Sequence, residues 1–190
     1  MKKGLLIVLS GPSGVGKGTV RECFMNDESL KLAYSISMTT RSPRVGEVDG
    51  VDYLFKTMDE FKAAVANGEL LEWAEFVGNC YGTPLAKVEE LRNEGKNVLL
   101  EIEVEGASQV KEKCPDAISI FITPPSMEEL ENRIRGRKTE AEEIVQQRLA
   151  KAAREMKKIG EYKYSVCNDN KEVAARIISE IIRANMECED

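Results

Sequence analysis

Histidine is absent from all 190 residues of the sequence, and its absence removes several kinds of chemistry. Histidine is the side chain that most readily exchanges a proton near neutral pH, and it is the commonest ligand of transition metals. Histidine-based triads, acid–base catalysis by histidine and most transition-metal sites are therefore excluded.

Cysteine is scarce and poorly arranged for cross-linking. The cysteines are odd in number, stand far apart and include no Cys-x-x-Cys pair. This pattern argues against a disulfide framework or a zinc site and indicates reduced thiols in a cytosolic protein. The five are Cys23, Cys80, Cys114, Cys167 and Cys188.

Long apolar runs and an excess of positive charge are missing as well. The apolar run at 5–9 follows two lysines, but it is too short for a signal peptide and leads directly into a glycine-rich loop. No other segment approaches the length of a transmembrane helix, and the net charge of −6 gives no overall attraction to nucleic acid or to an anionic membrane. We therefore expect a cytoplasmic protein with no nucleic-acid or membrane partner and no obligatory protein partner.

The residues that are present fit a soluble globular domain with a sizeable core, because 42% are hydrophobic and 32% are charged. Apolar runs typical of buried parallel strands alternate with helical patterns, which predicts an α/β fold with a doubly wound parallel sheet. Strands are expected at 5–9, 97–102, 117–122 and, more weakly, 164–167. Helices are expected at 17–25, 86–93, 107–113, 127–135, 141–159 and 172–186.

Two stretches interrupt this alternation within a single domain that spans 1–190. Short alternating pieces with many glycines and aromatics predict a small inserted β-rich lobe at 34–93. A highly charged, mostly helical stretch at 126–155 is broken at Gly136 and suggests a mobile lid. The remaining segments, 4–33, 94–125 and 156–190, are expected to form the core.

The stretch LSGPSGVGKGT at 9–19 matches the spacing of a phosphate-binding loop, between an expected strand and an expected helix. Glycines let backbone N–H groups converge on an anion, and Lys17 supplies a full charge for the β- and γ-phosphates. Gly18 stands where a hydroxyl usually follows the lysine, and Thr19 carries the hydroxyl one position later. The alternative is a glycine-rich turn with a surface lysine. The expected ATP-binding residues here are Gly11, Pro12, Ser13, Gly14, Val15, Gly16, Lys17, Gly18 and Thr19.

Two further groups of charged residues are ambiguous by themselves. Arg41, Arg44 and Tyr53 suit a dianionic phosphate, but exposed arginines in a loop are as often solvated charges. Glu101, Glu103 and Glu105 alternate along one expected strand face, where a metal site and a site that reads a base are equally plausible. Glu72 beside Trp73 would ordinarily be a surface charge.

Six motifs in order nevertheless resemble those of the bacterial guanylate kinases, over nearly the whole chain. They are SGPSGVGKGT (10–19), SISMTTRSPRVGEVDGVDY (35–53), ELLEWAEFVGNCYGTP (69–84), LLEIEVEGA (99–107), PPSMEELENRIRGRKTE (124–140) and QQRLAKA (146–152). The resemblance implies a P-loop three-layer fold and the reaction ATP + GMP → ADP + GDP, with Mg²⁺ and with dGMP as a further acceptor. It places this reaction in purine nucleotide metabolism and GMP recycling. Magnesium would be held mainly by the substrate phosphates, with help from Thr19.

The resemblance also implies roles for individual residues. Lys17, Arg41, Arg137 and Arg148 would be catalytic, with Arg137 and Arg148 brought by the lid to the transferring group. Asn168 would lie near the adenosine end of ATP, whereas Arg133 and Arg135 are expected to be surface residues. In the GMP-binding lobe at 34–93, the phosphate would be held by Arg41, Arg44, Tyr53 and Tyr81. The guanine would be surrounded by Ser37, Glu72 and Thr83 of this lobe and by Glu103 of the core.

The sequence departs from the family pattern at four positions. Glu103 replaces a common Asp, Glu105 a Gln, Lys138 a Gly and Cys80 a Tyr. Two alternative functions are a peptide-binding scaffold module and a kinase of the adenylate type. A peptide-binding scaffold module would have a degenerate phosphate loop, whereas Gly11, Gly16 and Lys17 remain here. The GKGT ending is similar to that of adenylate-type kinases, but Glu72, Thr83 and the arginine motif argue for GMP.

Overall fold

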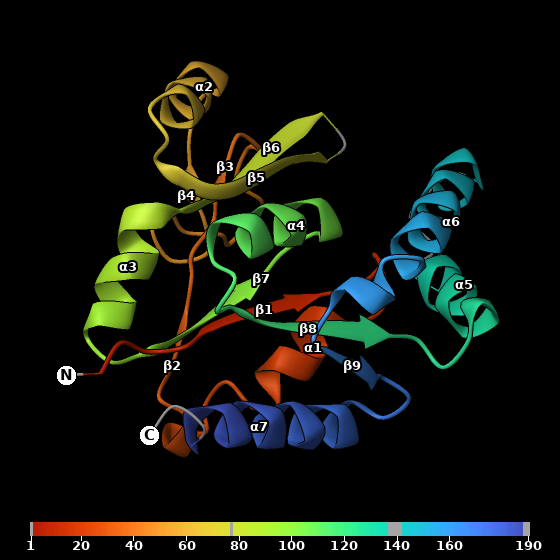
Figure 1. Ribbon diagram of the computed structural model, residues 1–190. Helices are drawn as coiled ribbons and strands as arrows, with labels where there is room; N and C mark the ends of the chain where they lie inside the picture. Colours follow the sequence, from red (N-terminus) through yellow and green to blue (C-terminus); the bar gives the residue numbers. More distant parts are fainter. Residues whose placement is uncertain (1, 77, 137–141, 188–190) are drawn as a thin grey trace. The chain divides into compact units, whose positions relative to one another are not determined.

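The computed structural model describes residues 2–76, 78–136 and 142–187. The elements in chain order are β1 (Leu6–Ser10), α1 (Lys17–Glu22), η1 (Glu28–Leu30), β2 (Leu32–Tyr34), β3 (Met38–Thr39), β4 (Leu54–Phe55), α2 (Met58–Ala66), β5 (Leu70–Phe76), β6 (Asn79–Pro84), α3 (Leu85–Asn93), β7 (Asn97–Glu101), α4 (Val104–Lys113), β8 (Ile118–Thr123), α5 (Met127–Arg135), α6 (Glu142–Met156), η2 (Ile159–Glu161), β9 (Tyr164–Cys167) and α7 (Lys171–Glu187) (Figure 1).

Five strands form a sheet in the order β2-β7-β1-β8-β9, and four form a second sheet in the order β4-β3-β6-β5. Strands β8 and β9 pair in parallel, from Ile120 opposite Tyr164 to Thr123 opposite Cys167. The predicted α/β class with a parallel sheet is confirmed. The chain divides into two compact units, which we call unit 1 (Met1–Ile7 and Ala33–Ala117) and unit 2 (Val8–Leu32 and Ile118–Asp190).

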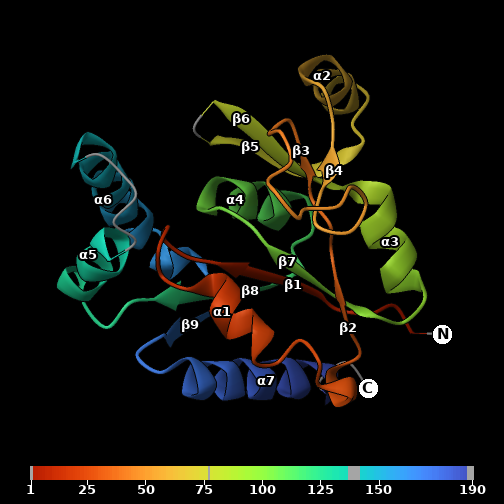
Figure 2. The ribbon, with the colours of Figure 1, turned by 180° about the vertical axis from the view of Figure 1, so that it is seen from behind.

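Unit 1 contains the four-stranded sheet, with α2 and α4 on its opposite faces (Figures 1 and 2). Its apolar cluster consists of Phe61, Ala64, Leu70 and Cys80, with Met38 and Val65 packed against it. Burial raises the pKa of the Cys80 thiol, which favours its protonated form.

Unit 2 is built around β8, whose residues Ile120, Phe121 and Ile122 are fully buried. Helix α7 runs alongside α1 and turns Ile178 and Ile182 into the core (Figures 1 and 2). Helices α5 and α6 lie next to each other in the same unit (Figure 2). Gly136 is the C-terminal cap of α5, which agrees with the expected helix break.

The strands predicted at 5–9, 97–102, 117–122 and 164–167 correspond to β1, β7, β8 and β9, and most helices also match. Three predicted helices differ at their ends: 17–25 ends at Glu22, 107–113 begins at Val104, and 141–159 ends at Met156. The first ends early because the N–H groups of Cys23 and Phe24 bond to carbonyls only three residues back, which is a tighter turn than an α-helix.

Helix α2 was missed in the lobe that was predicted to be β-rich. Thr57 and Glu60 form a reciprocal capping box at its start, and Phe61 and Ala64, three residues apart, face the core. The sequence signal T-x-x-E was present, but a single helical turn of apolar spacing is too short to stand out among glycines and aromatics.

Candidate active site

The loop between β1 and α1 depends on glycine at three positions. Gly11, Gly14 and Gly16 have positive φ angles of 149°, 88° and 93°. A Cβ at Gly11 would stand 2.4 Å from the carbonyl oxygen of Ile122, and one at Gly16 would stand 2.8 Å from Nδ2 of Asn168. The loop therefore lies closer to its neighbours in unit 2 than any residue with a side chain would permit. The φ angles and close contacts explain why glycine stands at these positions of the loop.

Two side chains of unit 2 hold this loop at the carbonyl group of Val15. Asn168 is buried, and its Nδ2 donates to the carbonyl oxygen of Val15 at 2.8 Å, while its own N–H donates to Thr123 at 2.8 Å. Arg133 of α5 donates to the carbonyl of Asn168 at 3.0 Å and to that of Val15 at 3.4 Å. Both side chains thus bond to the Val15 carbonyl from outside the loop, which fixes the loop backbone at this residue.

The expectation that Arg133 is a surface residue is wrong. Its guanidinium is only partly exposed and links Glu129 on its own helix, at 2.9 Å, to the loop of unit 2. Arg135 behaves as expected, since it pairs with Glu131 at 2.7 Å and with Glu142 on the protein surface. Helical spacing alone could not separate the two, because both have a glutamate four residues before them.

Lys17 and Arg148 place cationic groups at the loop. The ammonium of Lys17 donates to the carbonyl of Gly11 at 2.6 Å, and one such contact uses only one of its three N–H groups. Nη2 of Arg148 on α6 donates to Oγ of Ser13 at 2.9 Å, which brings this predicted catalytic arginine to the loop. Arg137 and Lys138 lie outside the described residues.

The predicted phosphate-binding residues of unit 1 form a separate cluster. The Arg41 guanidinium lies over the ring of Tyr53, 5.3 Å from its centroid, and the rings of Tyr53 and Tyr81 meet edge to face at 6.2 Å. Thr39 pairs with Phe55 on one side and with Tyr81 on the other, which puts Tyr81 in the same row as Phe55, two residues after Tyr53. Burial raises the pKa of Tyr53, so its hydroxyl stays a proton donor at neutral pH.

Glu47 is part of this cluster and was missed by the sequence analysis. Its Oε1 accepts from Nη2 of Arg41 at 2.8 Å, and its Oε2 accepts from the backbone N–H of Arg44 at 2.7 Å. These bonds lower the pKa of Glu47 and raise that of Arg41. Glu47 thus fixes one side of the Arg41 fork. The spacing of six residues between them follows no helix or strand period, so no pattern in the sequence signalled the contact.

Glu72 is the most unusual carboxylate of unit 1, because it is only 4% exposed. It stands directly opposite Thr83 in the β5–β6 ladder, and Thr83 Oγ1 donates to Glu72 Oε1 at 2.5 Å. Burial raises the pKa of Glu72 to about 7, against the opposing effects of the Thr83 bond and the positive charge of Lys113. A buried carboxylate with a raised pKa is a strong candidate for ligand recognition.

The carboxylates at 101, 103 and 105 do not alternate along a strand, so that interpretation was wrong. Strand β7 ends at Glu101, Glu103 is the N-terminal cap of α4, and Glu105 is exposed in its first turn. The charge of Glu103 acts on Glu72 and raises its pKa, which places Glu103 near the same site. Across the described parts of the chain, no group of three or more histidine, cysteine, aspartate or glutamate side chains could hold a metal ion.

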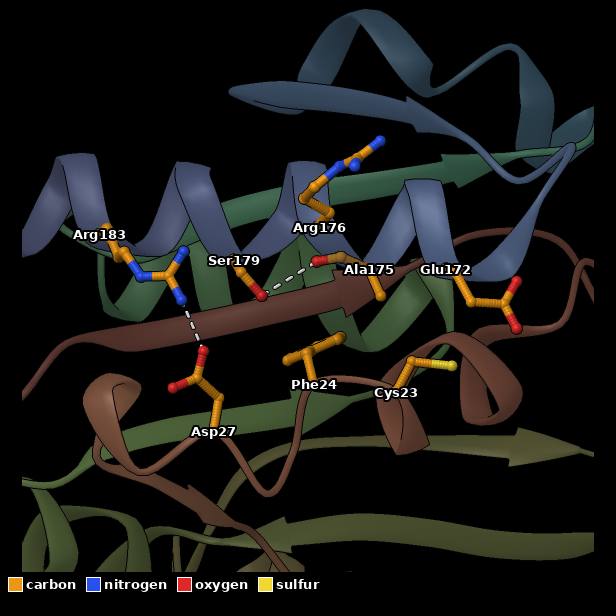
Figure 3. Close-up of a pocket in the computed structure, with 8 residues that line it drawn as sticks. All are labelled: Cys23, Phe24, Asp27, Glu172, Ala175, Arg176, Ser179 and Arg183. Carbon is orange, nitrogen blue, oxygen red and sulfur yellow. Dashed lines mark hydrogen bonds and ion pairs between the residues drawn. The ribbon is translucent and has the colours of Figure 1, made fainter.

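A cavity of about 270 Å³ lies elsewhere in unit 2, between α1 and α7 (Figure 3). An ion pair between Arg183 and Asp27 closes one end, and the Ser179 hydroxyl is already bonded to the carbonyl of Ala175. None of the predicted site residues lines it. It therefore contributes no group to the candidate active site.

Comparison with known proteins gives consistent results. A family model described as guanylate kinase matches residues 3–185. The guanylate kinase of Lactococcus lactis is 55% identical over 183 residues, covering 96% of this chain and 89% of that protein. The guanylate kinase of Bacillus subtilis is 54% identical over 183 residues, with coverages of 96% and 90%. Among solved structures, the guanylate kinase from Anaplasma phagocytophilum aligns with a TM-score of 0.76 at 37% identity, covering 96% of this chain and 86% of that one.

Proposed function

Since the chain belongs to the guanylate kinase family, and is thus a kinase that phosphorylates GMP with ATP, we propose that its two units divide the substrates between them. Unit 2 binds ATP through the 11–19 loop, and unit 1 binds GMP through the cluster around Arg41 and the site around Glu72. The loop geometry and the buried Glu72–Thr83 pair support this division.

The donor side needs positioning and charge neutralisation. The N–H groups of the loop and the Lys17 ammonium hold the β- and γ-phosphates, and Asn168 and Arg133 keep the loop in shape. Arg148, already at Ser13, and Arg137 neutralise charge on the transferring phosphoryl group. The acceptor is an ionised phosphate oxygen, so the reaction requires no general base.

The acceptor phosphate is bound by Arg41 and Arg44, with the hydroxyls of Tyr53 and Tyr81 as neutral donors. Glu47 orients the Arg41 fork before the phosphate arrives. The guanidinium is held against an aromatic ring, which reduces the rotamer freedom lost when the phosphate is bound.

Guanine is recognised by Glu72, with Ser37, Thr83 and Glu103 around it. An ionised carboxylate accepts from both the N1–H and the N2 amino group of guanine, whereas adenine has a lone pair at N1 and no amino group at C2. Adenine would leave a buried carboxylate unpaired, and a site of this kind can discriminate by about 10⁴-fold. We propose dGMP as a further acceptor, in keeping with the family.

The residues at the loop fit magnesium bound in the manner usual for nucleotide kinases. Magnesium commonly keeps several waters and binds one or two protein oxygens together with substrate phosphates. The exposed Thr19 hydroxyl, beside a glycine that offers no ligand, is an oxygen of the required type. Bound magnesium would neutralise phosphate charge. We further propose that 126–155 acts as the lid and 34–93 as the GMP lobe on the core at 4–33, 94–125 and 156–190.

The remaining proposals concern the cell. No helix in the described parts of the chain is long and apolar enough to cross a membrane. We propose a cytoplasmic enzyme of purine nucleotide metabolism that needs no protein partner for activity.

The decisive experiment measures ADP release from MgATP in the presence of GMP, AMP, CMP, UMP or dTMP separately. We expect turnover with GMP at a kcat/KM about 10⁴-fold above that with AMP. A preference for AMP would retain the kinase chemistry and contradict the role of Glu72. A folded protein without turnover on any acceptor would instead indicate a binding module.

A further inference from the structure

Helix α4 lies along β5, the strand at one edge of the four-stranded sheet of unit 1 (Figure 1). Three side-chain positions on α4 meet β5 around Glu72, and none of them was assigned a role above. They are Gly106, Gln109 and Lys113, which we call the α4 face. Their spacing of three and four residues places them on the same side of the helix.

The first contact supports a bulge in β5. The ladder runs from Leu70 opposite Pro84 to Glu72 opposite Thr83, so β5 has one more residue than β6 in this interval. Nζ of Lys113 donates to the carbonyls of Leu70 at 3.2 Å and Leu71 at 2.7 Å. Because side chains alternate along a strand, the extra residue decides which face carries Glu72, and Lys113 bonds to the carbonyls on either side of that shift.

The second contact fixes the backbone just beyond Glu72. The Gln109 carboxamide accepts from the N–H of Trp73 at 3.1 Å and donates to its carbonyl at 2.6 Å. These are the two backbone groups that an edge strand leaves unpaired, and the carboxamide replaces the missing neighbour strand. The backbone on both sides of Glu72 is therefore tied to α4.

The third contact limits the position of the carboxylate itself. A Cβ at Gly106 would stand 2.1 Å from Oε2 of Glu72 and 2.9 Å from its Cδ. Gly106 has no unusual φ angle, so the requirement for glycine here is one of space and not of backbone conformation. Thr83 donates to Oε1 at 2.5 Å, so both carboxylate oxygens have a close neighbour that limits their movement.

We propose that Gly106 and Gln109 are positioning residues that set the reach of Glu72 and so determine discrimination for guanine, an inference that depends on the proposed role of Glu72. A side chain at position 106 displaces the carboxylate, and loss of the Gln109 clamp lets the bulged strand shift. In both cases Glu72 remains present and buried, but it no longer meets both donors of the base.

The test is the pair of variants Gly106→Ala and Gln109→Leu, with Gly160→Ala as the matched control because an added Cβ there meets nothing within 4 Å. We expect KM for GMP to rise about tenfold or more in both variants, with kcat and KM for ATP changed less than about twofold. The ratio of kcat/KM for GMP to that for AMP should fall in parallel. Gly160→Ala should match the wild type in all four quantities.

A rescue experiment separates positioning from a general effect on the fold. Glu72→Asp shortens the side chain by one methylene, which returns the space that Gly106→Ala removes. We expect the fold-increase in KM for GMP of the double variant to be well below the product of the fold-increases in the two single variants. Independent effects that multiply would overturn the inference for Gly106.

Unchanged KM for GMP in both Gly106→Ala and Gln109→Leu would overturn the proposal. If Gly106→Ala fails to fold, Gln109→Leu decides by itself, since Gln109 is only half-buried. Glu72→Gln, measured in parallel, distinguishes failure of the proposed role of Glu72 from failure of the inference about Gly106 and Gln109. If that variant keeps the wild-type KM for GMP, the role of Glu72 is wrong. If it loses GMP while the α4 variants do not, only the present inference fails.

Discussion

We propose that the ATP phosphates are bound in unit 2 by backbone N–H groups of the 11–16 loop, except at Pro12, and by Lys17 directly after them. The groups proposed for GMP in unit 1 are side chains from strands, loops and the start of α4, spread between 37 and 103. Backbone groups are the same for every residue type, so the loop can recognise a phosphate but offers nothing specific to a base. Side chains can match the donors and acceptors of one base, and the proposed site of unit 1 consists of side chains.

The same difference predicts how each site fails. The loop depends on backbone conformation and on outside contacts to its carbonyls, so substitutions there should affect ATP and leave GMP binding intact. The site of unit 1 depends on a buried charge, so substitutions there should change base choice and the pH dependence of stability. Trp73, the only tryptophan in the chain, directly follows Glu72 in β5, and we expect its fluorescence to change when GMP binds.

The largest effect should come from Lys17→Met. We expect kcat to fall by about 10³-fold or more, because the charge on the donor phosphates is no longer neutralised in the transition state. The GMP-dependent change in Trp73 fluorescence should be retained, which would show that the two sites fail separately. A kcat within tenfold of the wild type would contradict the role of the loop.

Arg41→Met should produce the next largest effect, on the acceptor side. We expect kcat/KM for GMP to fall by about 10²–10³-fold, since a charged fork to a dianion is lost, while KM for ATP stays unchanged. Arg135→Met, which removes a surface arginine of unit 2, is the control and should leave kinetics unaltered. Wild-type kinetics in Arg41→Met would place the acceptor phosphate elsewhere.

The third prediction concerns stability and pH in unit 1. The folded pKa of Glu72, about 7, lies above its ordinary value of 4.5, so folding favours the protonated form. The stabilisation is complete below pH 4.5 and is lost as the pH rises through about 7, where an ionised carboxylate must stay buried. Glu72→Gln should therefore raise the free energy of unfolding by about 3 kcal/mol at high pH and change it little at low pH.

Denaturant unfolding at pH values on either side of this window measures that difference. Glu75→Gln, which neutralises an exposed carboxylate on the same strand, is the matched control. A stability gain in Glu72→Gln that does not depend on pH would show that the gain does not come from removing a buried ionised carboxylate. The gain should come together with loss of GMP recognition, since the neutral amide cannot accept from both guanine donors.

The smallest effect should follow from Asn168→Ala in unit 2. Loss of the bond to Val15 leaves the loop less ordered, so we expect KM for ATP to rise about tenfold, with KM for GMP unchanged. Steady-state kinetics with each substrate varied in turn test this. A rise in KM for GMP of the same size would show that Asn168 acts on the whole fold and not on the loop.

The two sites also differed in how far the sequence predicted them. The loop was predicted residue by residue, because its glycines, lysine and following helix are contiguous and their spacing is set by local geometry. For unit 1 the residues alone left Arg41, Arg44 and Glu72 ambiguous, and only the family resemblance assigned them. Glu47 and the contacts of Arg133 were not found at all, because both depend on pairs with no regular spacing.

The sequence by itself determined the alternation of strands and helices, the phosphate loop and the family, since each is carried by periodicity or by a contiguous motif. The tertiary structure alone decided that Glu72 is buried opposite Thr83, that α4 begins early enough to bring Gly106 against it, and that the arginine cluster is held by Glu47. These facts arise from strand register, from a one-residue bulge and from close packing. Such features join residues at irregular separations, from six between Arg41 and Glu47 to 34 between Glu72 and Gly106, and no local pattern encodes them.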